Sequence, residues 1–308
     1  MSDFRVNSIT NQDGSAGPQV CGVSTFSGKS GVQIPSGSSE FRRQDGGGRG
    51  RGIIAGGITP SNQTTIDLIE IATLGDSTDF GDLSYGRAVK DVGCSSATRA
   101  LFGGGYIVGT GDSNAIDFVI ISSGGNAFDF GNLNVATLRD GGKVCNSTRG
   151  IWAGGQVIPS TSPGTTNIIQ FVTMATTGNA TDFGDLTSAY GYGGGVSNGV
   201  RGLVGGGANP SGEVNHMDYI TIATTANSQD FGDLLYAREH VGAVSNSTRG
   251  VWFGGVTPTY QSDIQYVIIN TLGNAVDWGD LSIKATAGST SYTRGYSSGS
   301  SDSHGGLI

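Results

Sequence analysis

Apolar positions between residues 51 and 281 fall into short runs that recur in the same order five times. The middle run of each copy carries Ile, Val, Phe, Met or Tyr at both odd and even positions, so a strand formed from it is apolar on both faces. Such a strand has to be covered on both sides. The five copies are IDLIEI (66–71), IDFVII (116–121), IQFVTM (169–174), MDYITI (217–222) and IQYVII (264–269).

Two further sequence phrases recur with the same period as this strand. One starts with arginine and ends in a double glycine, at intervals of 48, 50, 52 and 48 residues: RGIIAGG (51–57), RALFGGG (99–105), RGIWAGG (149–155), RGLVGGG (201–207) and RGVWFGG (249–255). The other reads TDFGDL (78–83), FDFGNL (128–133), TDFGDL (181–186), QDFGDL (229–234) and VDWGDL (276–281). An extended stretch such as HVGAVSNS (240–247) precedes the arginine phrase and adds a fourth strand. No helical periodicity appears.

Four short strands in each repeat, with both sheet faces to be covered, predict an all-β fold of the β-propeller class. In a propeller each blade is sandwiched between two neighbours, which explains why one repeat cannot stand alone. The stretch KATAGSTSYTRG (284–295) is interpreted as a first strand that completes blade one and closes a five-bladed ring. The alternative is a sixth blade, in which TRGYSSGS (293–300) is a degenerate second strand joined by N-terminal strands.

The chain divides into three parts on this pattern. Residues 1–45 alternate brief β-prone pieces with Gly, Ser and Asn turns, and they hold too few apolar residues to fold alone. Such a segment becomes ordered by adding strands to another protein or by intertwining with copies of itself. The propeller is expected over residues 46–295, followed by a Gly/Ser-rich tail at 296–308.

Composition and charge exclude several functions. Glycine supplies 55 of 308 residues, as tight turns and β-bulges require, and the net charge is −8. An acidic chain whose only basic stretch is FRRQDGGGRGR (41–51) is a poor binder of nucleic acid or anionic membranes. No run approaches the ~20 apolar residues of a membrane span, and MSDFRVNSITNQDG (1–14) lacks the features of a signal peptide. The widely spaced Cys21, Cys94 and Cys145 predict free or buried thiols in a reducing cytoplasm.

The repeated charges are interpreted as structural. Carboxylates three residues apart would suit calcium or acid–base catalysis, but this pattern occurs five times and is once altered to Asn132, whereas a catalytic pair occurs once. We therefore expect the carboxylates to make turns and to pair with the repeat arginines in or between blades. The residues are Arg51, Arg99, Arg149, Arg201 and Arg249, with Asp82, Asp185, Asp233 and Asp280.

Other site chemistry is missing from the sequence. His216, His240 and His304 lack metal-ligand spacing, and no nucleophile elbow or phosphate-binding loop is present. We therefore expect no catalytic residues, no metal and no cofactor.

The loops between the second and third strands are the expected contact surface. They differ in length and chemistry from copy to copy, whereas the turns on the opposite side are nearly constant, so the repeat's own packing does not hold them. Tyr106, His216 and Tyr260 are the candidate binding residues here. The alternative for each is an exposed loop side chain with no partner.

The phrases carry two resemblances. A double glycine, a strand and then an aromatic residue with Leu, as in GRAVKDVGCSSATRALFGGG (86–105) and FDFGNL (128–133), resemble a kelch-type blade, although the kelch tyrosine is missing. VNSITNQDGSAGP (6–18) and GVSTFSG (22–28) resemble the N-terminal attachment segments of tail-fibre-like proteins of tailed bacteriophages, especially those of marine cyanobacteria.

The second resemblance implies a structural protein of the virion, made in the host cytoplasm and present in a multi-copy assembly. Residues 1–45 would then bind other virion proteins, and the propeller would contact neighbouring proteins or a host-surface glycan or receptor. A soluble cytoplasmic kelch-like adaptor is the main alternative. A carbohydrate-processing propeller enzyme is a third, which the missing acid–base residues disfavour.

Overall fold

The computed structural model describes residues 51–58, 60–71, 75–88, 93–135, 141–157 and 164–282. Its contacts divide the chain into two units at Arg49 and Gly50, and all described residues belong to the second unit. The expected attachment segment, closing strand, sixth-blade strands and C-terminal tail lie outside the described residues, as do Cys21 and His304.

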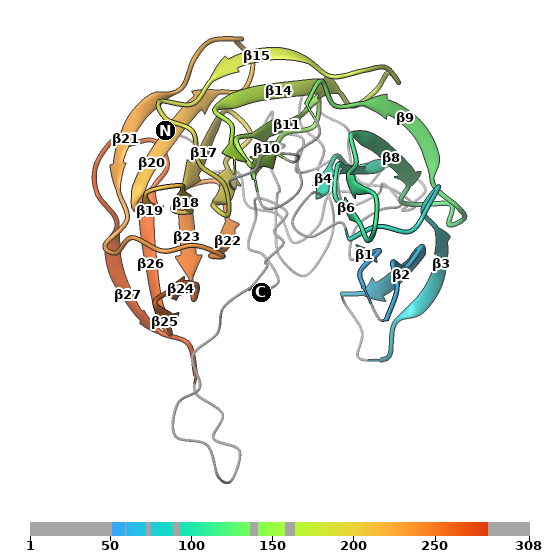
Figure 1. The fold of residues 1–308 in the computed structure, drawn as a ribbon, viewed down its shortest axis with the longest axis horizontal. Coiled ribbons are helices and arrows are strands. Elements are labelled where there is room, and N and C mark those ends of the chain that lie inside the picture. The colour runs from blue at the N-terminus through green and yellow to red at the C-terminus, as the bar shows by residue number, and fades with distance from the viewer. Residues whose placement is uncertain are drawn as a thin grey trace, which may run out of the picture. The chain divides into compact units, whose positions relative to one another are not determined.

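Five antiparallel sheets follow one another around a common axis in chain order, as Figure 1 shows from blue to orange. Blade 1 contains β1 (Arg51–Ala55), β2 (Thr65–Glu70) and β3 (Thr78–Asp82). Blade 2 contains β4 (Gly93–Ser95), β5 (Arg99–Gly103), β8 (Ala115–Ile120) and β9 (Phe128–Asn132). Blade 3 contains β10 (Gly142–Cys145), β11 (Arg149–Ala153), β14 (Ile168–Thr173) and β15 (Thr181–Asp185).

Blade 4 contains β16 (Gly194–Ser197), β17 (Arg201–Gly205), β20 (His216–Thr221) and β21 (Gln229–Asp233). Blade 5 contains β22 (Gly242–Ser245), β23 (Arg249–Phe253), β26 (Asp263–Ile268) and β27 (Val276–Asp280). The described residues contain no helix. The protein is thus a five-bladed β-propeller, and the expected fold class is confirmed.

Each loop between the second and third strands of blades 2 to 5 contains a two-stranded hairpin. Each hairpin forms its own two-stranded sheet, and three of them are also joined by a single antiparallel bridge to the loop that enters their blade: Ala88 with Tyr106, Gly191 with Ala208, and Glu239 with Val256. They are β6 (Tyr106–Ile107) with β7 (Gly111–Asp112), β12 (Gln156–Val157) with β13 (Gly164–Thr165), β18 (Ala208–Asn209) with β19 (Gly212–Glu213), and β24 (Val256–Thr257) with β25 (Thr259–Tyr260).

The hydrophobic core lies between blades. On β8, the buried side chains of Ile116 and Phe118 join a cluster with Trp152 of blade 3. Val119, on the opposite face of the same strand, joins a cluster with Ile66 of blade 1. The third strand is therefore covered on both faces, as its apolar pattern predicts, and each blade derives its stability from its neighbours.

The glycine in the fourth strand of blades 1 to 4, such as Gly184 in β15, packs closely against the next blade. The register of β14 and β15 shifts at Ile169, which makes a bulge beside Gly184, and the φ angle of Gly184 is 143°. A Cβ atom on Gly184 would lie 2.5 Å from the carbonyl carbon of Ala226, in the turn of the next blade. The repeat therefore requires glycine here for both its backbone conformation and its close approach to the next blade.

Candidate binding face

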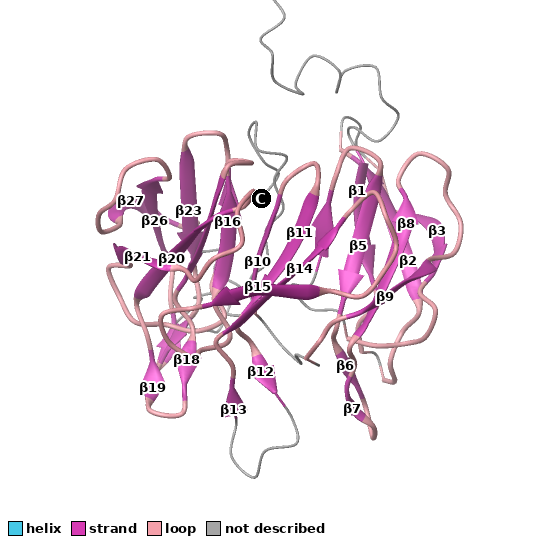
Figure 2. Ribbon diagram, turned by 90° about the horizontal axis from the view of Figure 1, so that it is seen from above, coloured by secondary structure: helices cyan, strands magenta, loops and turns pink. Residues whose placement is uncertain are grey.

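The hairpins lie along one side of the propeller. Figure 2 shows β6–β7, β12–β13 and β18–β19 extending from the same edge, which the alternating strand directions predict for the loops between second and third strands. Because these hairpins differ in sequence while the turns at the other edge repeat, this edge carries most of the variation of the molecule. We call it the hairpin face.

The three candidate residues lie in three different blades. Tyr106 is half-buried on β6, where its backbone exchanges hydrogen bonds of 2.8 and 3.0 Å with Ala88. Tyr260 lies on β25 and is 48% exposed. His216 begins β20; its ring stands edge-on to Tyr190 at 4.6 Å between centroids, and Nε2 lies 3.0 Å from the Ser188 hydroxyl. Tyr260 is therefore the most accessible of the three, whereas the ring of His216 is held by contacts with Ser188 and Tyr190.

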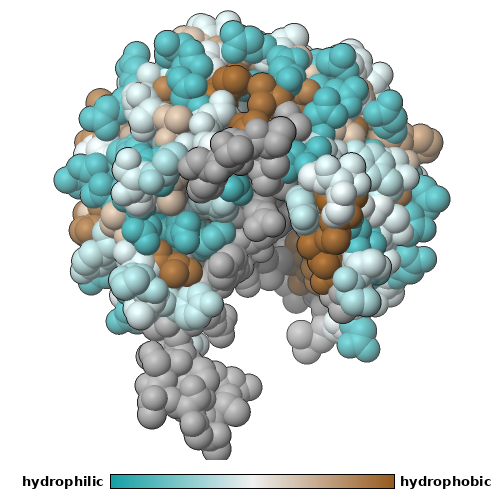
Figure 3. Space-filling model, viewed as in Figure 1, coloured by the Kyte–Doolittle hydropathy of each residue, from teal (hydrophilic) through white to brown (hydrophobic). Residues whose placement is uncertain are grey.

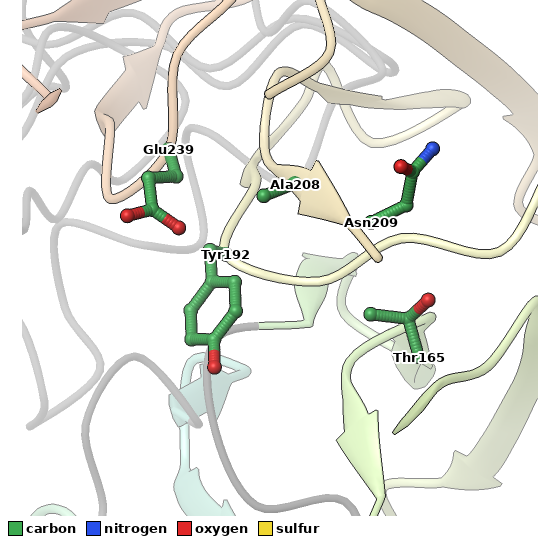
Figure 4. A pocket seen from close by; sticks show the side chains of 5 residues that line it. All are labelled: Thr165, Tyr192, Ala208, Asn209 and Glu239. Atoms are coloured by element: carbon green, nitrogen blue, oxygen red, sulfur yellow. The ribbon is translucent and has the colours of Figure 1, made fainter. Parts of the chain in front are cut away.

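A small hollow lies among blades 3, 4 and 5 on this face. It has a volume of about 220 Å³ and is lined by Thr165, Tyr192, Ala208, Asn209 and Glu239. Figure 4 shows Glu239 and Tyr192 on one side, with Asn209 and Thr165 on the other. None of the three sequence-predicted residues belongs to this lining among the described residues.

Two residues beside the hollow have a left-handed backbone. Tyr192 (φ 64°) and His240 (φ 55°) are the non-glycine residues with positive φ in the described part of the chain. Both lie in the loop that leads into the first strand of their blade, and their ring centroids are 4.6 Å apart. The Tyr192 hydroxyl donates to Oε1 of Gln156 at 2.6 Å, and the His240 amide donates to the Tyr192 carbonyl at 2.9 Å.

Such conformations cost about 1–3 kcal/mol each and gather at functional sites. Tyr192 was not among the binding residues predicted from the sequence. Its only signal there was a large aromatic residue within a run of glycines, YGYGGG at 190–195, where a small residue would suffice for a turn.

The lining combines an aromatic ring with a hydroxyl, an amide and a carboxylate. This set offers hydrogen-bond donors and acceptors beside an apolar surface, which suits a neutral polar ligand such as a sugar ring or a polar side chain. The volume is below the roughly 300–1,000 Å³ of sites for drug-sized molecules. The hollow can therefore hold one small unit of a larger partner.

The repeat arginines make different contacts from those expected. The guanidinium groups of Arg99, Arg149 and Arg201 donate from Nη1 to main-chain carbonyls of the following blade, at 2.8, 2.7 and 2.9 Å. Each also lies over an aromatic ring of its own blade, at 4.5 to 4.7 Å from the ring centroid. The expected pairing with a repeat carboxylate is wrong for these three, because a carbonyl at a strand end supplies an acceptor without burying a second charge.

The repeat aspartates act through their main chain and local bonds. The Asp82 amide donates to Oδ1 of Asn126 at 3.1 Å, and its carboxylate accepts from Thr64 at 2.7 Å. Asp280 likewise accepts from Ser262 at 3.1 Å. The amides of Asp185 and Asp233 repeat the bond to a turn asparagine of the next blade.

Buried polar groups tie the loop that enters a blade to its third strand. Arg87 and Asp117 are both buried, and Nη1 of Arg87 lies 2.9 Å from Oδ2 of Asp117. Arg238 makes a similar pair with Asp263 at 2.8 Å. In blade 4 a tyrosine takes this place, and the Tyr190 hydroxyl donates to Oδ2 of Asp218 at 3.2 Å.

Burial, assisted by the negative charge of Asp218, raises the pKa of Tyr190 well above its ordinary value. The folded chain then holds this proton more tightly than the unfolded chain, so the stability gained is complete below about pH 10 and falls as the pH rises toward the folded-state pKa. We expect Tyr190→Phe to cost about 1.5–3 kcal/mol at neutral pH, where Asp218 loses a donor, and to reduce the loss of stability above about pH 10.

Urea unfolding at neutral and alkaline pH measures both effects. Tyr236→Phe, which changes an exposed tyrosine, is the control. Equal alkaline destabilisation of the native protein and Tyr190→Phe would contradict this assignment.

The described cysteines are free thiols. A hydrogen bond with Cys145, together with burial, raises the pKa of the Cys94 thiol well above its ordinary value. A protonated buried thiol is a poor nucleophile, so Cys94 contributes to packing between blades 2 and 3.

Within the described ranges, no group of three or more His, Cys, Asp or Glu residues is arranged to hold a metal ion. No helix in those ranges has the length and apolar character needed to cross a membrane.

Comparison with known proteins adds no relative. No model of a known protein family matches the chain, and no curated protein is significantly similar to it. The class of the protein therefore rests on its fold, the five-bladed β-propeller.

Proposed function

We propose that this chain is a non-enzymatic structural protein of a tailed-bacteriophage particle, and that its hairpin face makes the contacts. The proposed binding role rests mainly on the contrast between the two faces, because the hairpins differ in sequence from blade to blade while the turns at the other edge repeat. In addition, Tyr192 and His240, the non-glycine residues with positive φ among those described, lie beside a polar hollow on the hairpin face. The phage assignment rests on the phrases at 6–18 and 22–28.

The structure favours a binding role for physical reasons. The buried ion pairs and the arginine–carbonyl bonds all lie within or between blades, where they hold the scaffold. The groups that line the hollow on the hairpin face are a hydroxyl, an aromatic ring, an amide and one carboxylate, a set that recognises sugars or polar peptide segments. We propose a host-surface glycan or a neighbouring virion protein as the partner.

Proteomic analysis of purified particles tests the virion assignment. We expect this chain in stoichiometric amounts with the other particle proteins, and we expect a variant lacking residues 1–45 to fold but to be absent from particles. Recovery of the full chain only from the soluble cytoplasm would overturn the proposal in favour of a cytoplasmic adaptor.

Substitutions at the hairpin face test the contact surface. Asn209→Ala and Tyr260→Ala are expected to weaken adsorption of particles to host cells, or binding to the glycan bound by the native protein, without changing the thermal unfolding temperature. Leu272→Ala is a matched control, because Leu272 is 56% exposed but lies in a turn at the opposite edge. Equal effects of the control and the test variants would exclude the hairpin face.

A further inference from the structure

The first strands of neighbouring blades meet over a glycine. In blades 3 to 5 the residue after the repeat arginine is glycine, and it pairs in register with the last residue of the first strand of its own blade; the pairs are Gly150–Cys145, Gly202–Ser197 and Gly250–Ser245. A Cβ atom built on Gly250 would lie 2.7 Å from a methyl carbon of Val196, in the preceding blade. The glycine therefore leaves room for a side chain from the preceding blade.

Two first-strand side chains converge at each of these glycines. One belongs to the next-to-last residue of the first strand in the preceding blade, and the other to the last residue of the first strand in the glycine's own blade. Between blades 4 and 5 these residues are Val196 and Ser245. The Ser245 hydroxyl donates to the Ser197 carbonyl of blade 4 at 2.8 Å, so its side chain crosses the boundary between the blades.

Both converging positions are cysteine at the boundary of blades 2 and 3. Cys94 is the next-to-last residue of β4, and Cys145 is the last residue of β10. The Cβ atom of Cys94 lies 3.3 Å from the place that a Cβ atom on Gly150 would take, and Gly150 is the register partner of Cys145. The two cysteines therefore approach the same glycine from the two blades.

The two thiols meet at this glycine. Sγ of Cys94 lies 3.9 Å from the carbonyl oxygens of Val144 and Ile151, and Val144 is bonded directly to Cys145. Cys145 packs against the hydrophobic cluster that contains Cys94. A hydrogen bond joins the two thiols.

We propose that Cys94 and Cys145 form a reversible disulfide that cross-links blades 2 and 3. A disulfide requires two Cβ atoms about 3.5–4.5 Å apart. Two thiols that already touch, with no side chain on Gly150 between them, reach this geometry without a rearrangement of the strands. Valine and serine occupy the same places at the next two boundaries, as Val144 with Ser197 and Val196 with Ser245.

The oxidant is a small disulfide such as oxidised glutathione, and the reaction is thiol–disulfide exchange. Cys145 is half-buried while Cys94 is 2% exposed, so Cys145 reacts first. Its thiolate attacks one sulfur of the small disulfide, and one glutathione leaves as a thiolate and takes up a proton. Cys94 then gives its proton to water, its sulfur attacks Sγ of Cys145, and the second glutathione leaves in the same way. Two protein thiols are oxidised to one disulfide, and one small disulfide is reduced to two thiols.

The surroundings of the chain decide the state of this pair. A reducing cytoplasm keeps both residues as thiols, and an oxidising environment closes the disulfide. The attack by Cys94 is the slow step, because a buried thiol gives up its proton reluctantly.

The cross-link lies away from the hairpin face. Cys145 ends β10 at the turn into β11, whereas the hairpin β12–β13 follows the other end of β11. Figure 3 looks onto the hairpin face, where the surface of the described residues is mainly hydrophilic with small apolar patches. The disulfide therefore strengthens the scaffold and leaves the candidate hollow unchanged, and it does not depend on the proposed function.

Redox titration of the whole protein tests the site. The chain is incubated at neutral pH with increasing ratios of oxidised to reduced glutathione, the remaining thiols are alkylated, and disulfides are located by peptide mapping. We expect a disulfide between Cys94 and Cys145 of one chain, which excess reduced glutathione reverses. Its absence at the most oxidising ratio would overturn the proposal. A bond of either cysteine to Cys21, to a second chain or to glutathione in its place would overturn it as well.

Moving the pair to another boundary tests the geometry. In the background Cys94→Val with Cys145→Ser, which restores the residues of the other boundaries, we expect no disulfide within the chain. Adding Val196→Cys with Ser245→Cys places the pair over Gly250, and we expect a disulfide between blades 4 and 5 under the same conditions. Failure of the moved pair would show that convergence at the glycine does not determine the bond, and would overturn the basis of the proposal.

Thermal unfolding gives an independent readout. The disulfide closes a loop of about 50 residues and so restricts the unfolded chain. We expect the oxidised native protein to unfold roughly 5–15 °C above the reduced form. The variant Cys94→Val with Cys145→Ser is expected to unfold at one temperature in both buffers. Equal unfolding temperatures of the oxidised and reduced native protein would overturn the cross-linking role.

Discussion

Asp117→Ala is expected to lower the free energy of unfolding by about 3–5 kcal/mol, because it leaves the buried guanidinium of Arg87 without its counter-charge. Both side chains are at most 1% exposed and their atoms lie 2.9 Å apart. The substitution also removes the acceptor of both Ser84 bonds, which connect blade 1 to blade 2. Urea unfolding followed by circular dichroism measures the change.

Glu70→Ala is the matched control for this prediction. Arg51 and Glu70 form an ion pair at 3.1 Å, but the side chains are 30% and 49% exposed. Exposed pairs contribute about 0–1 kcal/mol, so the control is expected to unfold close to the native protein. Equal losses from the two variants would show that burial does not govern the Arg87–Asp117 pair.

Gly184→Ala is expected to cost about 2–5 kcal/mol, the sum of backbone strain and overpacking. Gly184 has a φ of 143°, and the added Cβ would lie 2.5 Å from backbone atoms of Ala226 in blade 4. The turn at Ala226 cannot move away without disturbing the neighbouring hydrogen bond from the Asp185 amide to Asn227, which connects blades 3 and 4. Thermal unfolding and limited proteolysis measure the loss.

Gly279→Ala is the control that separates backbone strain from overpacking in the Gly184→Ala prediction. Gly279 has a similar φ of 139°, and the added Cβ meets nothing within 4 Å among the described contacts of blade 5. Strain alone therefore makes it milder than Gly184→Ala. Equal losses of stability from the two variants would show that the close approach to the next blade adds nothing to the backbone strain.

The repeat could be recognised in the sequence because the features that define it depend on residues close together in the chain. Strand order, the two-faced third strand and the bulge glycine depend on residues a few positions apart, so IDFVII and DFGNL indicate their structure directly. The partners of the repeat arginines were not visible. The acceptor of Arg99, the Met174 carbonyl, lies 75 residues away in the chain. Because every residue has a main-chain carbonyl, the residue type does not indicate which one accepts this bond.

The candidate site was predicted only in part. The variation among loops identified the hairpin face, since residues that do not hold the repeat are free to differ between copies. It did not identify Tyr192 and His240, which come together only because blades 4 and 5 are neighbours around the axis. His216 was selected for its chemistry, but its ring packs against Tyr190 within blade 4.

The sequence by itself determined the all-β class and the period, because the strand pattern recurs in each repeat and one repeat cannot bury its apolar faces alone, but it left five and six blades as alternatives. Only the tertiary structure decided which polar groups meet across neighbouring blades and where the hollow forms. Those contacts join residues 33 to 75 positions apart in the chain, at distances set by the packing of whole sheets and not by any local pattern.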